Sequence, residues 1–133
     1  MQRFVYADNA GTTALSKTAL EAMMPYLTEF YGNPSSIYSL GRKSKSAIEA
    51  ARQKIAAAIG AKAEEIYFTG GGSEADNWAI RSVVEKMSKK GRHIISTAIE
   101  HHAVLHTLQA LEKQGCEVTY LPVDSYGQIS LED

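Results

Sequence analysis

The sequence has 133 residues, a net charge of −1 and a pI near 6.4, values that argue against several classes of partner. A near-neutral chain offers no broad positive surface for DNA, RNA or an anionic membrane, so we expect neither nucleic acid nor membrane as a partner. Hydrophobic residues make up 44% and charged residues 22%, as in ordinary globular domains. The longest nearly apolar run, residues 55–61, is far shorter than the roughly 20 residues of a membrane-spanning helix. Cys116 is the only cysteine and cannot form an internal disulfide, which favours a reducing, cytoplasmic setting.

The first half of the sequence predicts helices rather than strands. We expect an extended arm, a helix, a loop and a second helix, over residues 1–15, 17–30, 32–36 and 41–60. Ser16 is the predicted N-cap of the first helix, and Pro25 predicts a kink or break within it. Asn33 precedes a proline and is therefore disfavoured in helical conformation. Gly60 is a suitable left-handed end for the second helix.

The second half alternates between strand-type and helix-type segments. We expect strand, helix, strand, helix and strand, over residues 66–69, 73–90, 93–97, 102–114 and 117–121. This alternation predicts a parallel sheet with helical crossovers, and hence an α/β fold. Residues 124–133 predict a turn and a short extended piece at 128–131. Because such a sheet would leave its first and third strands exposed, we expect the sequence to be part of a larger domain.

Three consecutive glycines, Gly70 to Gly72, lie between a predicted strand and a predicted helix. Glycine is tolerated there when the backbone must approach a ligand closely, and the free N–H groups of a helix start attract phosphate. Ser73 would add a hydroxyl donor. A plain turn is the alternative, because Ser73 and Asp76 also resemble a capping box in which Ser73 is the N-cap. The spacing matches neither the triphosphate-binding loop nor the dinucleotide-binding fingerprint.

A histidine-rich segment follows the second predicted strand, at the end where open α/β sheets place their ligands. His101 is placed level with the glycine segment, where an imidazole could lie flat on an aromatic ring. His102 and His106 are four residues apart and could share one helix face. That spacing is compatible with zinc if Glu100 or His93 supplied a further ligand, but no cysteine pair supports a metal site, so we predict none.

Several segments, in order along the whole chain, resemble one family. They are residues 7–13 (ADNAGTT), 32–42 (GNPSSIYSLGR), 68–77 (FTGGGSEADN), 93–95 (HII) with 99–105 (IEHHAVL), and 118–124 (VTYLPVD). Together they are similar to the N-terminal part of the cysteine desulfurases, pyridoxal-phosphate-dependent enzymes of the class V aminotransferase group. The resemblance implies the N-terminal portion of the large domain of an aminotransferase-type (fold type I) enzyme, mainly parallel sheet with flanking helices. Residues 1–15 would then belong to the small domain, and residues 16–133 to an incomplete large cofactor-binding domain.

The resemblance also implies a reaction and roles for three residues. Gly72 and Ser73 correspond to the pair that binds the phosphate of pyridoxal 5′-phosphate. His101 corresponds to the histidine that stacks on the pyridine ring and takes part in catalysis. The family removes sulfur from L-cysteine, giving alanine and an enzyme persulfide for iron–sulfur cluster assembly or thiolation. Its members are homodimers that pass sulfur to an acceptor protein.

The family's Schiff-base lysine and nucleophilic cysteine correspond to no residue of this sequence. We therefore expect the 133-residue chain alone to be inactive and to bind the cofactor weakly or not at all. Cys116 follows a glycine that ends a predicted helix, which is a place for a small packing residue rather than a reactive thiolate. Two alternatives stay open: another class V enzyme such as a selenocysteine lyase, or a non-catalytic module that binds a phosphate or the cofactor.

Overall fold

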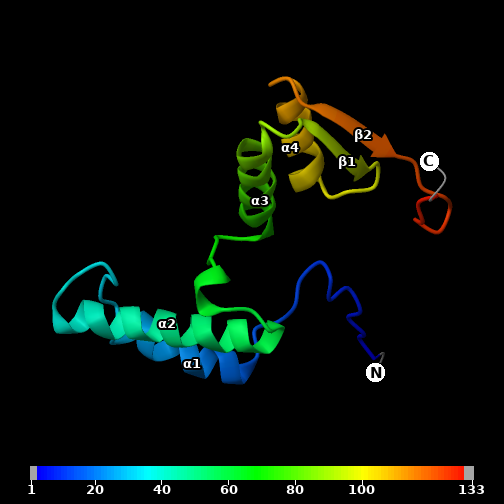
Figure 1. The fold of residues 1–133 in the computed structure, drawn as a ribbon. Coiled ribbons are helices and arrows are strands. Elements are labelled where there is room, and N and C mark those ends of the chain that lie inside the picture. Colours follow the sequence, from blue (N-terminus) through cyan, green and yellow to red (C-terminus); the bar gives the residue numbers. More distant parts are fainter. Residues whose placement is uncertain (1–2, 131–133) are drawn as a thin grey trace. The chain divides into compact units, whose positions relative to one another are not determined.

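The computed structural model describes residues 3–130 and divides the chain into two compact units, the first ending at Tyr67 and the second beginning at Phe68 (Figure 1). The first unit is helical and the second combines helices with strands. In the part of the chain that is described, no helix is long and apolar enough to cross a membrane.

The first unit contains α1 (Lys17–Thr28), α2 (Ser39–Ile59) and the short 3-10 helix η1 (Ala63–Glu65). Both long helices were predicted, and residues 3–15 form no helix or strand, as expected for an arm. The predicted N-cap of α1 is confirmed, because Ser16 Oγ accepts the Ala19 N–H at 3.1 Å. The predicted break at Pro25 is wrong, because α1 continues through the proline to Thr28.

The loop between α1 and α2 is fixed by short polar contacts. Asn33 closes a turn, since its side-chain oxygen accepts the Ser35 N–H at 2.9 Å and its carbonyl accepts the Ser36 N–H at 3.0 Å. A Cβ on Gly41 would lie 2.5 Å from the Asn33 carbonyl oxygen, so this close approach requires a glycine. Ser44 is buried and donates to the Phe30 carbonyl at 3.1 Å, which ties α2 to the end of α1.

Most large apolar side chains of the first unit stay exposed, including Leu27, Tyr31 and Ile59. A cavity of about 460 Å³ is lined mainly by apolar residues of α2 and of the loop that follows α1. The left-handed end of α2 is confirmed, with φ of 69° at Gly60. The first unit is therefore held by caps, turns and close backbone approaches more than by a core.

The strand predicted at residues 66–69 is wrong. Ile66 has extended backbone angles, but the segment pairs with no strand in residues 3–130. A β-strand is stabilised by its partner as much as by its own residues, and no neighbour is available here. Arg52 holds the start of the segment by donating to the Ile66 carbonyl oxygen.

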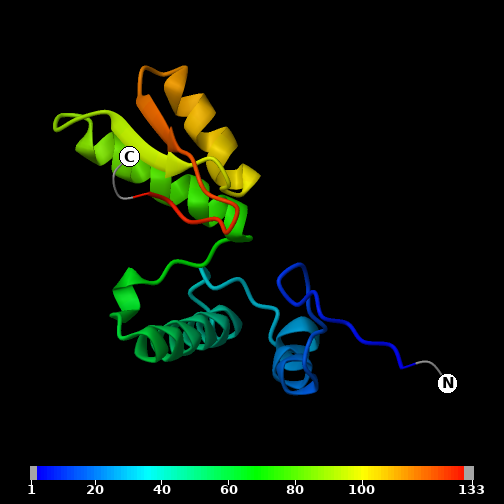
Figure 2. The same cartoon turned by 90° about the vertical axis from the view of Figure 1, so that its right-hand side faces the viewer.

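The second unit contains α3 (Gly72–Met87), β1 (His93–Thr97), α4 (His102–Glu112) and β2 (Glu117–Leu121). β1 and β2 pair in parallel, with Ile94 opposite Val118 and Ser96 opposite Tyr120. The chain returns from β1 to β2 through α4, as a parallel pair requires, so the predicted α/β fold is confirmed (Figure 2). The helix predicted to end at Gly115 ends earlier, at Glu112, and Gly115 takes a left-handed φ of 88° in the turn that follows.

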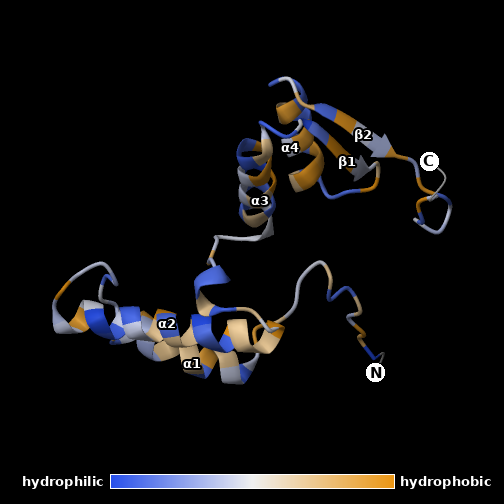
Figure 3. Cartoon of the chain, in the orientation of Figure 1, coloured by the Kyte–Doolittle hydropathy of each residue, from blue (hydrophilic) through white to orange (hydrophobic). Residues whose placement is uncertain are grey.

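The core of the second unit is centred on α4. Leu108 is 1% exposed and packs with Leu111 and Cys116, which are also buried. Partly buried residues of α3, α4 and both strands surround this cluster, namely Ile80, Val84, Ile94, Val104, Val118 and Tyr120. Figure 3 shows the resulting hydrophobic colouring on α4 and on the strands. As predicted, Cys116 is a packing residue.

The predicted turn after β2 is confirmed. Asp124 accepts the N–H groups of Tyr126 and Gln128 through Oδ1, at 2.8 and 2.9 Å. Gly127 takes a left-handed φ of 77°, which a side chain would strain. The extended piece predicted at 128–131 forms no strand over residues 128–130, and Leu131 lies outside the described residues.

Candidate functional site

The glycine segment leads into α3, whose first turn has no side-chain cap. The N-cap is Gly71, and Ser73 occupies the second helical position, so the capping box with Ser73 as its N-cap is wrong. Glu74 reaches back instead, because its Oε2 accepts the Gly70 N–H at 2.6 Å. The first N–H groups of a helix have no intrahelical acceptor. With no side-chain cap at Gly71, they remain available to an anion outside the helix.

The glycines at the start of α3 face open space. A Cβ on Gly71 or Gly72 would meet no atom of the chain within 4 Å. Neither residue has a φ in the left-handed region that glycine alone adopts readily. Internal packing and backbone strain therefore do not explain why glycine is used here. Room for a group that approaches the backbone from outside does explain it, and a phosphate is such a group.

His101 is the N-cap of α4. Its Nδ1 accepts the Ala103 N–H at 3.1 Å, which fixes the position of the exposed ring. Because Nδ1 is an acceptor in this contact, the neutral imidazole carries its proton on Nε2. His101 therefore presents an Nε2–H and both ring faces while its backbone starts a helix. This arrangement suits a histidine that stacks on a ring and exchanges a proton.

A cavity of about 400 Å³ lies between the start of α3 and the start of α4. It is lined by residues of α3 and of the first turns of α4, and these include both Ser73 and His101. Gly72, the third predicted site residue, precedes Ser73 in the same turn but does not line this cavity. The full lining is Ser73, Asn77, Arg81, His101, His102, Ala103, His106 and Thr107. It contains the cationic Arg81 and no carboxylate, so its charge complements an anion.

Asn77 and Thr107 connect the two helix starts, and the sequence analysis did not identify this link. Asn77 Nδ2 donates to the Ser73 carbonyl at 2.9 Å, and the Thr107 hydroxyl lies 2.6 Å from Asn77 Oδ1. Thr107 is 2% exposed. The sequence carried one signal, a threonine between the apolar positions Val104 and Leu108, which needs a polar partner if it is buried; nothing in the local sequence identifies that partner.

The other histidines do not assemble a metal site. His102 and His106 do share one helix face, as predicted, with ring centroids 5.1 Å apart. His93 instead bonds Thr119 Oγ1 at 2.7 Å, and Glu100 lies 3.4 Å from Thr97 Oγ1. Among residues 3–130, no three His, Cys, Asp or Glu side chains lie close enough to hold a metal ion.

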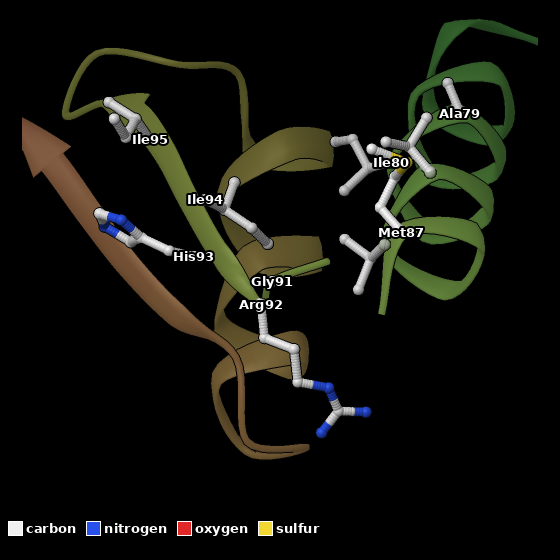
Figure 4. A pocket seen from close by; sticks show the side chains of 10 residues that line it. Ala79, Ile80, Met87, Gly91, Arg92, His93, Ile94 and Ile95 are labelled. Carbon is white, nitrogen blue, oxygen red and sulfur yellow. The ribbon is translucent and has the colours of Figure 1, made fainter. Parts of the chain in front are cut away.

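A second cavity, of about 490 Å³, lies between α3 and β1. Figure 4 shows Ile80 and Met87 of α3 and Ile94 of β1 around it, while His93 points to the other side of the strand. Apart from Arg92 and His93 its lining is apolar, so it offers fewer polar groups than the α3–α4 cavity. The α3–α4 cavity is therefore the better candidate site.

Comparison with known proteins identifies the family of the chain. The model of the family described as Aminotransferase class-V matches residues 5–133. A protein of Methanosarcina thermophila named cysteine desulfurase IscS is 58% identical over 97% of this chain and 32% of its own length. A solved structure titled NifS-like protein has a TM-score of 0.88 at 42% identity, covering 94% of this chain and 34% of its own. Another, titled SspA in complex with cysteine, has a TM-score of 0.87 at 39% identity, covering 96% and 37%.

The chain thus spans about a third of the length of the relatives it matches. The structural matches confirm the aminotransferase-type fold that the resemblance implied. The sequence matches confirm the resemblance to the N-terminal segment of cysteine desulfurases. By the extent of these matches, the chain belongs to the class V aminotransferase family.

Proposed function

We propose that the chain forms the phosphate- and ring-binding part of a pyridoxal-phosphate-dependent cysteine desulfurase. The observation that carries the proposal is the α3–α4 cavity, which places Ser73 at an uncapped helix start and His101 at a neighbouring one. The proposed reaction converts L-cysteine into alanine and an enzyme persulfide. The names of the relatives, and the cysteine complex among the solved structures, support the substrate.

Each residue has a distinct role in this proposal. The backbone N–H groups at Gly72 and Ser73 and the Ser73 hydroxyl bind the cofactor phosphate, aided by the positive end of the α3 dipole. The His101 ring stacks on the pyridine ring, and its Nε2–H exchanges a proton with the substrate. When bound, pyridoxal phosphate supplies an electron sink for the bonds at the substrate Cα.

The cavity lacks two groups that the reaction needs. No lysine lines it, and the buried Cys116 packs in the core of the second unit. We therefore propose that residues other than those of this cavity supply the lysine and the nucleophilic thiol. On the same family grounds we propose a homodimer, a sulfur-acceptor protein as partner, and residues 1–15 as part of the small domain. A cytoplasmic setting is supported by the lone cysteine, which has no disulfide partner.

The first test measures binding of pyridoxamine 5′-phosphate to the full product of the gene, after removal of bound cofactor, by isothermal titration calorimetry. This probe has no aldehyde, so it cannot form imines with surface lysines. Pyridoxamine without phosphate is the matched ligand control. We expect Ser73→Ala to weaken binding by about tenfold, since it removes a hydrogen bond to a charged group. Equal binding of both ligands, or no loss in Ser73→Ala, would contradict the assignment of the phosphate site.

The second test concerns the reaction and uses the full product of the gene. Alanine formation from L-cysteine is measured with and without His101→Ala, together with cofactor content. We expect His101→Ala to lower the rate by about 100-fold, because an acid–base group and a stacking surface are both lost. If the full product forms no alanine while it retains cofactor, the activity is wrong and the binding role alone stands.

A further inference from the structure

We propose that Asn77 and Thr107 are positioning residues that hold the phosphate-binding turn of α3 and the His101 end of α4 in one arrangement. This inference rests on the proposed function of the cavity. Neither residue bears the chemistry itself. Each acts through a neighbour, Asn77 through Ser73 and Thr107 through Asn77.

The contacts form a continuous path between the two site residues. Asn77 Nδ2 donates to the Ser73 carbonyl at 2.9 Å and lies 3.4 Å from the Ala103 carbonyl. The N–H of the same Ala103 is accepted by His101 Nδ1 at 3.1 Å. Two residues, Asn77 and Ala103, thus join the serine expected at the phosphate to the histidine expected at the ring.

Thr107, on α4, contacts two members of this path, Asn77 and Ala103. Its hydroxyl lies 2.6 Å from Asn77 Oδ1 and 2.8 Å from the Ala103 carbonyl, and its single proton is donated to one of them at a time. The hydroxyl is buried, so it cannot be exchanged for water at little cost. No buried side-chain nitrogen or oxygen among residues 3–130 lacks a partner, so this polar network is fully satisfied. A satisfied network inside a helix–helix contact specifies one register of the two helices.

The geometry explains why the network acts on the site and not only on stability. Asn77 lies one turn after Ser73, and Thr107 lies one turn after Ala103, so the contact is level with the cavity. Carbon and oxygen atoms cannot approach to 2.6 Å without repulsion. A methyl group in place of the Thr107 hydroxyl therefore pushes α3 and α4 apart at the height of the two site residues.

The deciding variant is Thr107→Val, which keeps the shape of the side chain and removes the hydroxyl. We expect it to weaken pyridoxamine 5′-phosphate binding by about fivefold, the usual weight of one buried hydrogen bond. Thr107→Ser restores the hydroxyl and is expected to bind within about twofold of the unchanged protein. Thr107 lines the cavity but is 2% exposed, so almost none of its surface is available for direct contact with the probe.

The matched control is Ile80→Val. Ile80 belongs to α3 and packs against the same core, but it does not line the α3–α4 cavity. We expect this variant to lower stability without changing the affinity for the probe. If Ile80→Val weakens binding as much as Thr107→Val does, affinity follows stability alone and the positioning role is overturned.

Asn77→Ala completes a double-mutant cycle with Thr107→Val. If the two residues act as one connection, the double variant loses little more affinity than either single variant. Additive losses would overturn the connection. Failure of the proposed function gives a different pattern, in which Ser73→Ala leaves binding of the probe unchanged.

A measurement without ligand tests the positioning role even if the proposed function of the cavity is wrong. The amide resonance of Ser73 and the ring resonances of His101 are compared by NMR in all variants. We expect both to shift in Thr107→Val and to return in Thr107→Ser. Unchanged resonances at Ser73 in Thr107→Val would overturn the inference, whatever the outcome with the probe.

Discussion

The two units of the chain are built on different kinds of contact. In the second unit, Leu108, Leu111 and Cys116 form a core that both helices and both strands surround. In the first unit, the buried residues are small, and large apolar side chains such as Leu27 and Tyr31 stay exposed. Every proposed site residue lies in the unit that has the core.

This difference shows what positions a functional group. Helix caps and turns fix one element at a time, as Ser16 does for α1. A core fixes elements relative to one another, and only then can polar contacts such as Thr107 to Asn77 set a register between helices. A site shared between α3 and α4 therefore requires that these two helices pack against a common core. The following experiments test this difference between the two units.

The largest expected effect is on the core of the second unit. Leu108→Ala leaves a cavity where a side chain is 1% exposed, and such changes cost about 2–5 kcal/mol. A unit of this size has a stability of similar magnitude, so we expect it to unfold or nearly so. The measurement is urea unfolding, followed by Trp78 emission for the second unit and by helical circular dichroism for the first.

The matched control is Leu27→Ala in α1, which makes the same chemical change at an exposed position. We expect it to alter the free energy of unfolding by less than about 0.5 kcal/mol. Equal losses in the two variants would mean that the two units do not differ in the way described.

The elements themselves were largely predictable from the sequence. Periodic apolar residues, Ser16 and Gly60 located α1 and α2, and alternation of segment types located β1, α4 and β2. The strand at residues 66–69 was not correctly predicted, because strand formation depends on a partner that the local sequence does not reveal. The local rule for proline also failed, since α1 continues through Pro25 to Thr28.

The next effect tests the close contacts of the first unit. Gly41→Ala places a Cβ 2.5 Å from the Asn33 carbonyl and 2.7 Å from the Ser36 carbonyl. Both contacts are with backbone, so the loop must move, at a cost of about 1–3 kcal/mol that outweighs the better helix propensity of alanine. Amide hydrogen exchange across α2 measures the change. Gly91→Ala meets no atom within 4 Å and should leave exchange in the second unit unchanged.

The candidate site was predictable only in part. The run of glycines and the position of His101 pointed to the starts of α3 and α4, which do line one cavity. The N-cap was misplaced, because Ser73 and Gly71 are both acceptable caps by type, and the side chain of Glu74 decides between them. Thr107 was missed because its partner is 30 residues away and no local pattern connects them.

A smaller effect concerns the cap of α1. Ser16→Ala removes the acceptor for the Ala19 N–H, and we expect α1 to lose about 1 kcal/mol. Because few tertiary contacts support α1, the loss should appear as faster amide exchange confined to its first turn. Ser16→Asp keeps an acceptor and adds a charge that the helix dipole favours, so exchange should stay slow. Faster exchange throughout α2 as well would show that the first unit folds more cooperatively than its open packing indicates.

The smallest expected effect is a pH dependence of the free energy of unfolding, caused by Tyr120 at the edge of the core. Burial, the charge of Glu112 and a hydrogen bond of 3.3 Å to its Oε2 raise the pKa of Tyr120 above the ordinary 10.0. The folded state therefore holds this proton more tightly than the unfolded chain. Its contribution to stability is complete below pH 10.0 and is lost as the pH rises through the folded-state pKa.

Tyr120→Phe removes this loss, so its free energy of unfolding should fall less steeply than that of the unchanged protein above about pH 10. Urea unfolding at several pH values, for both proteins, measures the difference. Glu112→Gln is the informative partner variant, because it removes the charge and leaves Tyr120 at its place against the core. Since burial is the first cause of the raised pKa, the pH dependence should be reduced in Glu112→Gln but not abolished. Complete loss there would mean that Glu112, and not packing against the core of the second unit, controls this tyrosine.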